Sequence, residues 1–297
     1  MKILHKILIT FFILITTIVF ASPQMPDYII YKKDTIPTYN LILEQYLQKK
    51  NPNENKLFGL SFRGDENFAA PLNCWRGYQA IYAVIDSKLY LTKIISCGDL
   101  TNKSKINIVE SQRKMEEIFG DKIDDKGVFI NWFSGKISFP QRTMKNKELR
   151  WDGVFYRIFE YETVIDFDQG KFVKEENVHN YQKVLGGINR KSNDKISDKI
   201  FNKLKLEKWD KKFDCSEKYL ITIGEKGKIS NIKMTYSEKE IEEYFEKDEY
   251  NYCINKINNA LKIMQFDILK DKGNPIPEEI YLEIWQEKKG KLKNWTY

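Results

Sequence analysis

Alternating hydrophobic and polar positions run from the N-terminal part of the chain to about residue 175 and predict antiparallel strands. The strands pair as three hairpins, each with a short turn between its members: 78–86 with 88–96, 128–133 with 136–139, and 154–167 with 171–174. Gly135 and Gly170 stand in two of these turns, where a positive φ suits glycine. Further strands are predicted at 27–31 and 57–62.

Two helical stretches accompany the predicted strands. One lies around residues 39–47 and the other covers 111–119. Ser111 is the expected N-cap of the second helix, because its hydroxyl can accept a hydrogen bond from a backbone amide. Gly120 is the expected left-handed residue that ends this helix.

Residues 175–200 are rich in polar and turn-forming side chains, and the hydrophobic pattern lapses there. We therefore expect a domain boundary near residue 190. The fold class predicted is α+β, with an antiparallel β-rich domain at 22–190 and a small α+β domain at 195–297.

The C-terminal part shows helical and strand patterns in a clear order. Ile196, Ile200, Phe201 and Leu204 recur on one helical face and predict a helix over 196–209. The elements expected after it are strands at 219–223 and 229–234, a long helix over 241–264 interrupted near Asp248, and a closing strand at 279–286.

This order resembles the C-terminal domain of the TonB family: helix, strand, a turn of the form D/E-x-G-K/R-V/I, strand, helix and a last strand. The turn is matched here by Glu225-Lys226-Gly227-Lys228-Ile229. Helix 251–264, followed by Gln265-Phe266, is similar to the family's helix with its aromatic exit. The resemblance covers about 195–287, under a third of the chain.

The resemblance implies the fold of this part and the binding of a partner by strand addition at an exposed sheet edge. The chain departs from the family in having only 8 prolines and no proline-rich spacer, so energy transduction is not implied. Segments 74–78 and 88–92 resemble a recurrent part of uncharacterised bacterial exported proteins, which implies no activity.

Residues 1–21 have the form of a signal peptide. Lys2 and Lys6 precede an uncharged hydrophobic run at 7–21, which is shorter than the roughly 20 residues that a membrane span needs. Cleavage is expected after Ala21, and the alternative is an uncleaved anchor. We expect a periplasmic or secreted bacterial protein with no stable membrane span after cleavage.

The four cysteines form an even set, which in an oxidising compartment predicts two disulfides. The hairpin at 78–96 brings Cys74 and Cys97 to the same end and leaves Cys215 to pair with Cys253. His179 is the only histidine after cleavage and there is no C-x-x-C motif, so no metal site and no cofactor are expected.

Composition and charge narrow the function classes. Hydrophobic residues make up 42% of the chain, which excludes a disordered protein. The formal charge of +7 falls to +5 without Lys2 and Lys6, and the lysines are dispersed among acidic residues. Dispersed lysines indicate a solvated surface, so nucleic acid is not an expected partner.

Two aromatic groups are the candidate binding sites. Trp75, Arg76 and Tyr78 could stack on a sugar or hold a carboxylate, and the alternative is that the rings pack beside Cys74 while Arg76 extends to solvent. The second group is on the closing strand and comprises Tyr281, Glu283 and Trp285. Trp285 alternates with Ile284 and is the candidate anchor for a partner, unless it packs on the preceding helix.

Catalytic signatures are weak. His179 lies in a polar segment and is interpreted as a solvated loop residue. The three Ser-x-x-Lys matches are about as many as chance gives, and Arg63-Gly64-Asp65 is interpreted as a chance match. We therefore predict a non-enzymatic envelope protein that binds another envelope or outer-membrane protein. The alternatives are an enzyme that cleaves wall or other polysaccharide with carboxylates, and an immunity protein that blocks a toxin.

Overall fold

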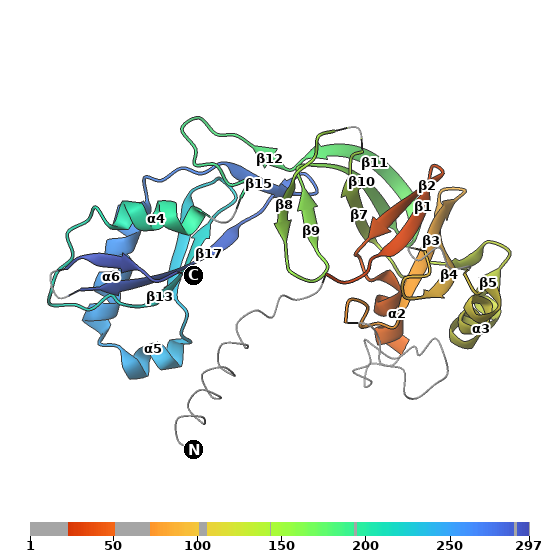
Figure 1. The fold of residues 1–297 in the computed structure, drawn as a ribbon, viewed down its shortest axis with the longest axis horizontal. Coiled ribbons are helices and arrows are strands. Elements are labelled where there is room, and N and C mark those ends of the chain that lie inside the picture. Colours follow the sequence, from red (N-terminus) through yellow and green to blue (C-terminus); the bar gives the residue numbers. More distant parts are fainter. Residues whose placement is uncertain are drawn as a thin grey trace, which may run out of the picture. The chain divides into compact units, whose positions relative to one another are not determined.

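A computed structural model of the chain describes residues 23–50, 72–100, 106–142, 144–192, 195–287 and 290–296. The predictions for residues 1–21, 57–62 and 63–65 lie outside these ranges. The chain forms two compact units (Figure 1). Of the described residues, unit 1 takes those between 23 and 139 with 151–157 and 163–176, and unit 2 takes those at 140–150, 158–162 and between 177 and 296. The predicted boundary near residue 190 stays a prediction.

The fold class is α+β, as predicted. The elements of the large sheet and its helices, in chain order, are β1 (Asp27–Tyr31), β2 (Asp34–Thr38), α2 (Ile42–Lys50), β3 (Tyr78–Ile85), β4 (Lys88–Ser96), α3 (Ile108–Phe119), β5 (Ile123–Asp124), β6 (Gly127–Phe129), β7 (Gly135–Pro140), β10 (Tyr161–Asp168) and β11 (Lys171–His179). A short 3₁₀ turn at Gly120–Lys122 follows α3, and β8 (Glu148–Trp151) pairs with β9 (Arg157–Phe159).

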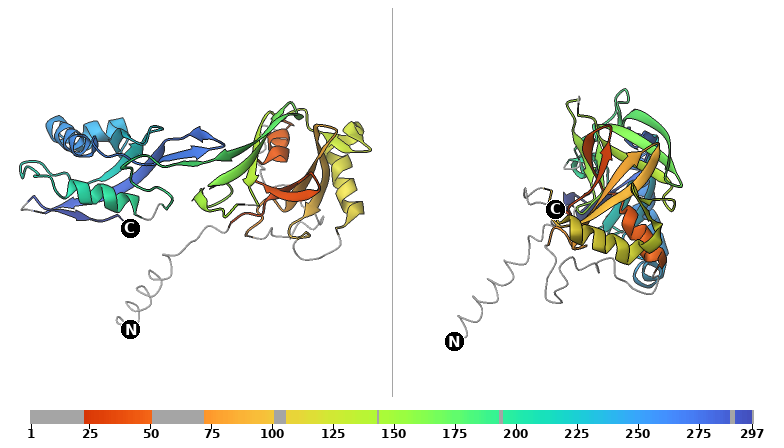
Figure 2. Two further views of the ribbon diagram at one scale, coloured as in Figure 1. Left: turned by 90° about the horizontal axis from the view of Figure 1, so that it is seen from above. Right: turned by 90° about the vertical axis from the view of Figure 1, so that its right-hand side faces the viewer.

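One large sheet forms unit 1, in the order β2-β1-β3-β4-β11-β10-β7, with β6 against β4 and β5 against β6. β1 runs parallel to β3, whereas β1–β2, β3–β4, β4–β11, β4–β6 and β5–β6 are antiparallel. The hairpins β3–β4 and β10–β11 are confirmed, and the turn residues Asp86, Ser87 and Gly170 all have positive φ. The strand expected at 154–167 is wrong in its first part, because β10 begins at Tyr161 and the short strand before it pairs with β8. Figure 2 shows this sheet from two further sides, with α3 against β4.

The predicted hairpin between 128–133 and 136–139 is wrong. β6 pairs with β4 through Tyr90↔Phe129 and Leu91↔Val128, and β7 joins β10. After β6, Ile130 donates its amide to Leu89 and Phe133 accepts a hydrogen bond from Gly170. The backbone groups of this segment are therefore bound by β4 and by the β10–β11 turn, which a local turn pattern does not reveal.

The second predicted helix is present, but its N-cap is Asn107, four residues before the expected Ser111. The Asn107 side chain accepts a hydrogen bond from the Glu110 amide, as N-cap side chains do. Ser111 is buried inside α3, where its hydroxyl accepts from the Ile94 amide. Gly120 ends the helix with a positive φ, but its ψ of −125° lies outside the left-handed helical region that was expected.

The remaining elements are β12 (Tyr181–Gln182), α4 (Ile196–Leu204), β13 (Lys218–Ile223), β14 (Ile229–Met234), α5 (Glu238–Tyr244), α6 (Lys247–Leu261), β15 (Ile268–Asp271), β16 (Asn274–Pro275), β17 (Glu278–Gln286) and β18 (Leu292–Asn294). The predicted order of helix, two strands, helix and strand is confirmed in α4, β13, β14, α6 and β17. The helix interruption falls at Phe245-Glu246, between α5 and α6, close to the expected Asp248.

The main sheet of unit 2 has four strands in the order β14-β13-β17-β18, one more than the three expected. β18 pairs with the end of β17 through Ile284↔Asn294 and Gln286↔Leu292. A small separate sheet, β12-β15-β16, was not expected either. These strands have only two to four residues, too few to show an alternating pattern.

Both predicted disulfides are present, Cys74–Cys97 and Cys215–Cys253. The first closes the open end of the β3–β4 hairpin, as expected. The second joins the segment before β13 to α6, and both of its cysteines are buried in the core of unit 2. Two disulfides are typical of proteins from an oxidising compartment.

Candidate functional site

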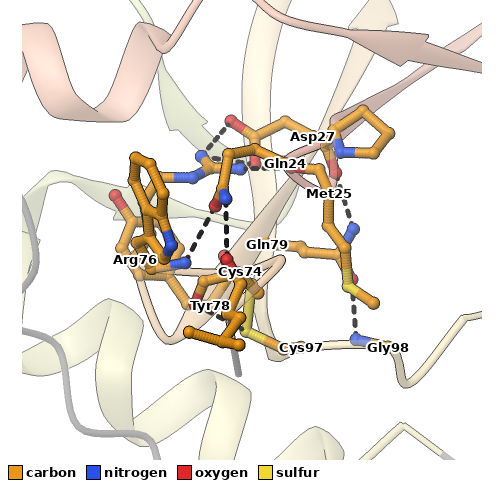
Figure 3. The surroundings of a disulfide bond; sticks show 12 residues. Gln24, Met25, Asp27, Cys74, Arg76, Tyr78, Gln79, Cys97 and Gly98 are labelled. Carbon is orange, nitrogen blue, oxygen red and sulfur yellow. Dashed lines mark hydrogen bonds and ion pairs between the residues drawn. A yellow bond between two sulfur atoms is a disulfide. The ribbon is translucent and has the colours of Figure 1, made fainter. Parts of the chain in front are cut away.

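The first candidate group surrounds Arg76, which lies on the loop between Cys74 and β3 (Figure 3). Its guanidinium Nη1 lies 2.8 Å from a carboxylate oxygen of Asp27 on β1 and 2.8 Å from Oε1 of Glu44 on α2. Nη2 donates to the Met25 carbonyl at 3.1 Å. The Arg76 side chain is 2% exposed, so both alternatives weighed for it, ligand binding and extension to solvent, are corrected.

Tyr78 is also buried, and its hydroxyl donates to Oε1 of Glu44 at 2.6 Å. Trp75 alone of the three keeps substantial exposure, at 40%. The group therefore does not form one surface. Its polar members join β1, α2 and the disulfide-bonded loop into the core of unit 1, and they are structural.

Two carboxylates share the single guanidinium in this buried group. Burial and the nearby Glu44 charge raise the pKa of Asp27 and Arg76 lowers it; burial is the largest of these effects, and the net pKa is about 6. Oε2 of Glu44 is buried and has no hydrogen-bond partner among the described residues. The Asp27 carboxylate therefore takes up a proton at a higher pH than an ordinary aspartate does.

The second candidate group lies on one face of the unit 2 sheet. Along β17, Ile280, Leu282 and Ile284 are buried in one core with α4 and α6, and the alternate residues face away from these helices. The register then places Tyr281 beside Leu220 and Glu283 beside Lys218 of β13. We call this helix-free surface the open face, defined by Leu220, Tyr281, Glu283, Trp285 and Trp295.

A stacked tryptophan pair is the most exposed aromatic feature of the open face. The ring centroids of Trp285 and Trp295 are 5.3 Å apart with an interplanar angle of 17°. Trp285 is 47% and Trp295 44% exposed. Trp295 follows β18, and its amide donates to the Glu283 carbonyl, which continues the ladder and sets the ring diagonally across from Trp285.

Trp295 was not among the sequence candidates. An alternating pattern in β18 would have indicated that this strand pairs with β17 and brings Trp295 to the open face. β18 has only three residues and shows no alternation. Trp285, in contrast, is exposed, which is one of the two alternatives weighed for it; packing on the preceding helix is the alternative that the structure does not show, because alternation along β17 sets its side.

Tyr281 and Glu283 form a polar pair beside the tryptophans. The Tyr281 hydroxyl donates to Oε2 of Glu283 at 2.7 Å. Partial burial, and after it the hydrogen bond and charge of the Glu283 carboxylate, together raise the pKa of Tyr281 to about 12. The phenol therefore stays protonated, and the pair presents an oriented carboxylate between two aromatic surfaces.

The β14 edge of the same sheet is available for strand pairing. Within the described residues β14 pairs only with β13, apart from an isolated bridge between Lys228 and Gln265 just before it. The Thr235 amide donates to Lys218 of β13. Because backbone groups alternate in direction along a strand, the amides of Ile232 and Met234 point to the outer edge.

His179 and possible metal-binding groups are the remaining candidates for chemistry. His179 is the last residue of β11, not a loop residue, and its ring stacks on Tyr161. No group of three or more His, Cys, Asp or Glu that could hold a metal ion occurs among the described residues. In the same part of the chain, no helix combines the length and the apolar character that crossing a membrane requires.

Comparisons with protein-family models, with curated proteins and with solved structures give no match for this chain. The resemblance to the TonB family therefore stays a prediction from the residue pattern and the order of elements.

Proposed function

We propose that this exported protein binds another protein of the cell envelope through the open face of unit 2, and that it is not an enzyme. The observation that carries the proposal is the exposed Trp285–Trp295 stack beside the Tyr281–Glu283 pair. Tryptophan and tyrosine supply a large share of binding energy at protein interfaces.

The composition of the open face favours a polypeptide partner. Its aromatic centre is bordered by charged side chains, among them Lys218 and the ion pair of Lys233 with Glu279 at 3.1 Å. An apolar centre with a polar rim is the usual anatomy of a protein interface. The two disulfides support an oxidising compartment for such an encounter.

Strand addition at β14 is the proposed second element of the same interaction. Ile232 and Met234 offer outward amides, and a partner segment in an extended conformation would pair with them. Binding should then slow hydrogen exchange at these two amides. Unchanged exchange at β14 in the presence of the partner would restrict the interaction to the open face.

The test is capture from an envelope extract by the immobilised full chain, compared with the double variant Trp285→Ala/Trp295→Ala. The matched control is Trp151→Ala, because Trp151 is 38% exposed and lies on β8, outside this sheet. We expect one protein to be retained by the parent and control chains and bound at least about 30-fold more weakly by the double variant.

Equal retention by the double variant would contradict the proposal. Retention of a polysaccharide in place of a protein, lost in the same double variant, would favour the carbohydrate alternative. Circular dichroism and intact disulfides in each variant keep loss of binding distinct from loss of folding.

A further inference from the structure

An open depression of about 610 Å³ lies in unit 2, outside the open face. Its lining includes Lys183, Lys191, Lys270, His179 and Glu160. These residues come from segments far apart in the sequence, near the end of β11, around β12 and on β15. The volume is that of a small-molecule site and is much larger than a single inorganic ion requires.

The charges around the depression do not cancel. Glu160 accepts a hydrogen bond from Lys191, and its Oε1 lies 3.4 Å from Nε2 of His179. The negative charge of Glu160 is therefore already paired with Lys191 and does not neutralise the other lysines. Lys183 and Lys270 have no ion-pair partner in the part of the chain that the structure describes. Two unneutralised ammonium groups therefore line the cavity, and an anion would compensate them.

Aromatic rings also line the depression. The His179 ring stacks on Tyr161 with centroids 4.4 Å apart and an interplanar angle of 10°. The Lys191 ammonium lies 5.0 Å from the centroid of the Tyr181 ring. Tyr181 is buried beneath this ammonium, whereas half of the His179 side chain is exposed, so the His179–Tyr161 stack is the flat surface that favours a ligand with a ring-shaped body.

We infer that this depression binds a small organic anion, a sugar-sized ring that carries a carboxylate or a phosphate. Lys183 and Lys270 contact the anionic group, and the His179–Tyr161 stack contacts the ring. Glu160 holds Lys191 and His179 in place at the wall. The site uses no residue of the open face, so it stands or fails independently of the proposed protein binding.

The test is a titration of the ¹⁵N-labelled full chain with glucuronate, with glucose 6-phosphate and with glucose, each at millimolar concentration. We expect the anionic sugars to shift the amide signals of Lys183 and Lys270, and glucose to leave them in place. If only one of the two anions binds, the result supports the site and assigns its ligand as a carboxylate or as a phosphate.

Lysine variants locate the site. Lys183→Gln and Lys270→Gln should each weaken binding of the anionic sugar about fivefold, the effect of removing one partly exposed charge. Lys226→Gln is the control, because Lys226 is an exposed lysine of the same unit outside the depression, and it should leave binding unchanged. Equal binding of glucose, no binding of either anion, or equal losses in all three variants would overturn the inference.

Discussion

Arg76 shows how the same side chain can look functional in the sequence and be structural in the protein. Its neighbours Trp75 and Tyr78 indicate a binding cluster, because aromatic rings and a guanidinium are frequent in binding sites. The partners that decide its role, Asp27 and Glu44, are 49 and 32 residues away. No local pattern links these positions, so the buried network could not be predicted.

Replacing Arg76 should be strongly destabilising. Arg76→Met leaves the buried carboxylates of Asp27 and Glu44 without their cation, and we expect the free energy of unfolding to fall by about 3–5 kcal/mol. Urea unfolding of the parent chain and of the variant measures this loss of free energy. The control is Arg113→Met, because the ion pairs of Arg113 on α3 are exposed, and this change should cost less than about 1 kcal/mol. Equal losses in both variants would contradict the assigned role of the network.

The same network predicts a pH dependence. In the folded chain the pKa of Asp27 is about 6, above its ordinary value of 3.8, so the folded state holds this proton more tightly than the unfolded chain. Asp27 therefore stabilises the fold fully below about pH 4, and this contribution, at most about 3 kcal/mol, is lost as the pH rises through about 6.

Asp27→Asn removes this titration while keeping an oxygen that can accept from the Ala80 amide. The unfolding free energy of the variant should rise relative to the parent chain between about pH 4 and pH 7, by up to about 3 kcal/mol. Urea unfolding of both chains at several pH values measures the difference. A difference that stays constant, or that falls with pH, would refute the raised pKa.

At the scale of elements, alternation predicts strands and short turns reliably, but it does not assign their partners. The β3–β4 and β10–β11 hairpins follow from their sequences because both strands are long and the turns are tight. The sequences of β6 and β7 also suggest a hairpin, yet β6 pairs with β4 and β7 pairs with β10. β18 is too short to predict, and the position of Trp295 beside Trp285 therefore could not be predicted either.

Gly227 occupies a tight turn of unit 2 in which a side chain has no room. Its φ is +70°, and an added Cβ would collide with the Phe266 carbonyl oxygen. Gly227→Ala should therefore lower the unfolding free energy by at least about 2 kcal/mol.

Gly186→Ala is the matched control for Gly227, because Gly186 has nearly the same φ, +72°, and no atom within 4 Å of an added Cβ. It should cost only about 1 kcal/mol, the penalty of the left-handed conformation itself. Thermal or urea unfolding of the two variants separates conformational strain from collision. If Gly227→Ala costs no more than Gly186→Ala, close packing of this turn against Phe266 is refuted.

At the scale of the whole molecule, the α+β class and both disulfides could be predicted, because they depend on periodicity and on a hairpin that brings two cysteines together. The candidate site could be predicted only in part. Tyr281, Glu283 and Trp285 lie on one strand, so alternation alone places them on one face. The charged depression around His179 depends on segments of β11, β12 and β15 that meet only in the fold.

Photo-cross-linking from the open face tests the proposed function most directly. A benzophenone amino acid replaces Tyr281, which is 38% exposed on β17, and in a separate chain Tyr244, which is 64% exposed on α5 of the same unit. Each full chain is irradiated in the envelope of cells that export it. We predict a covalent adduct with one polypeptide from position 281 and none from position 244. Adducts from position 244 alone, or no polypeptide adduct at position 281, would contradict binding through the open face.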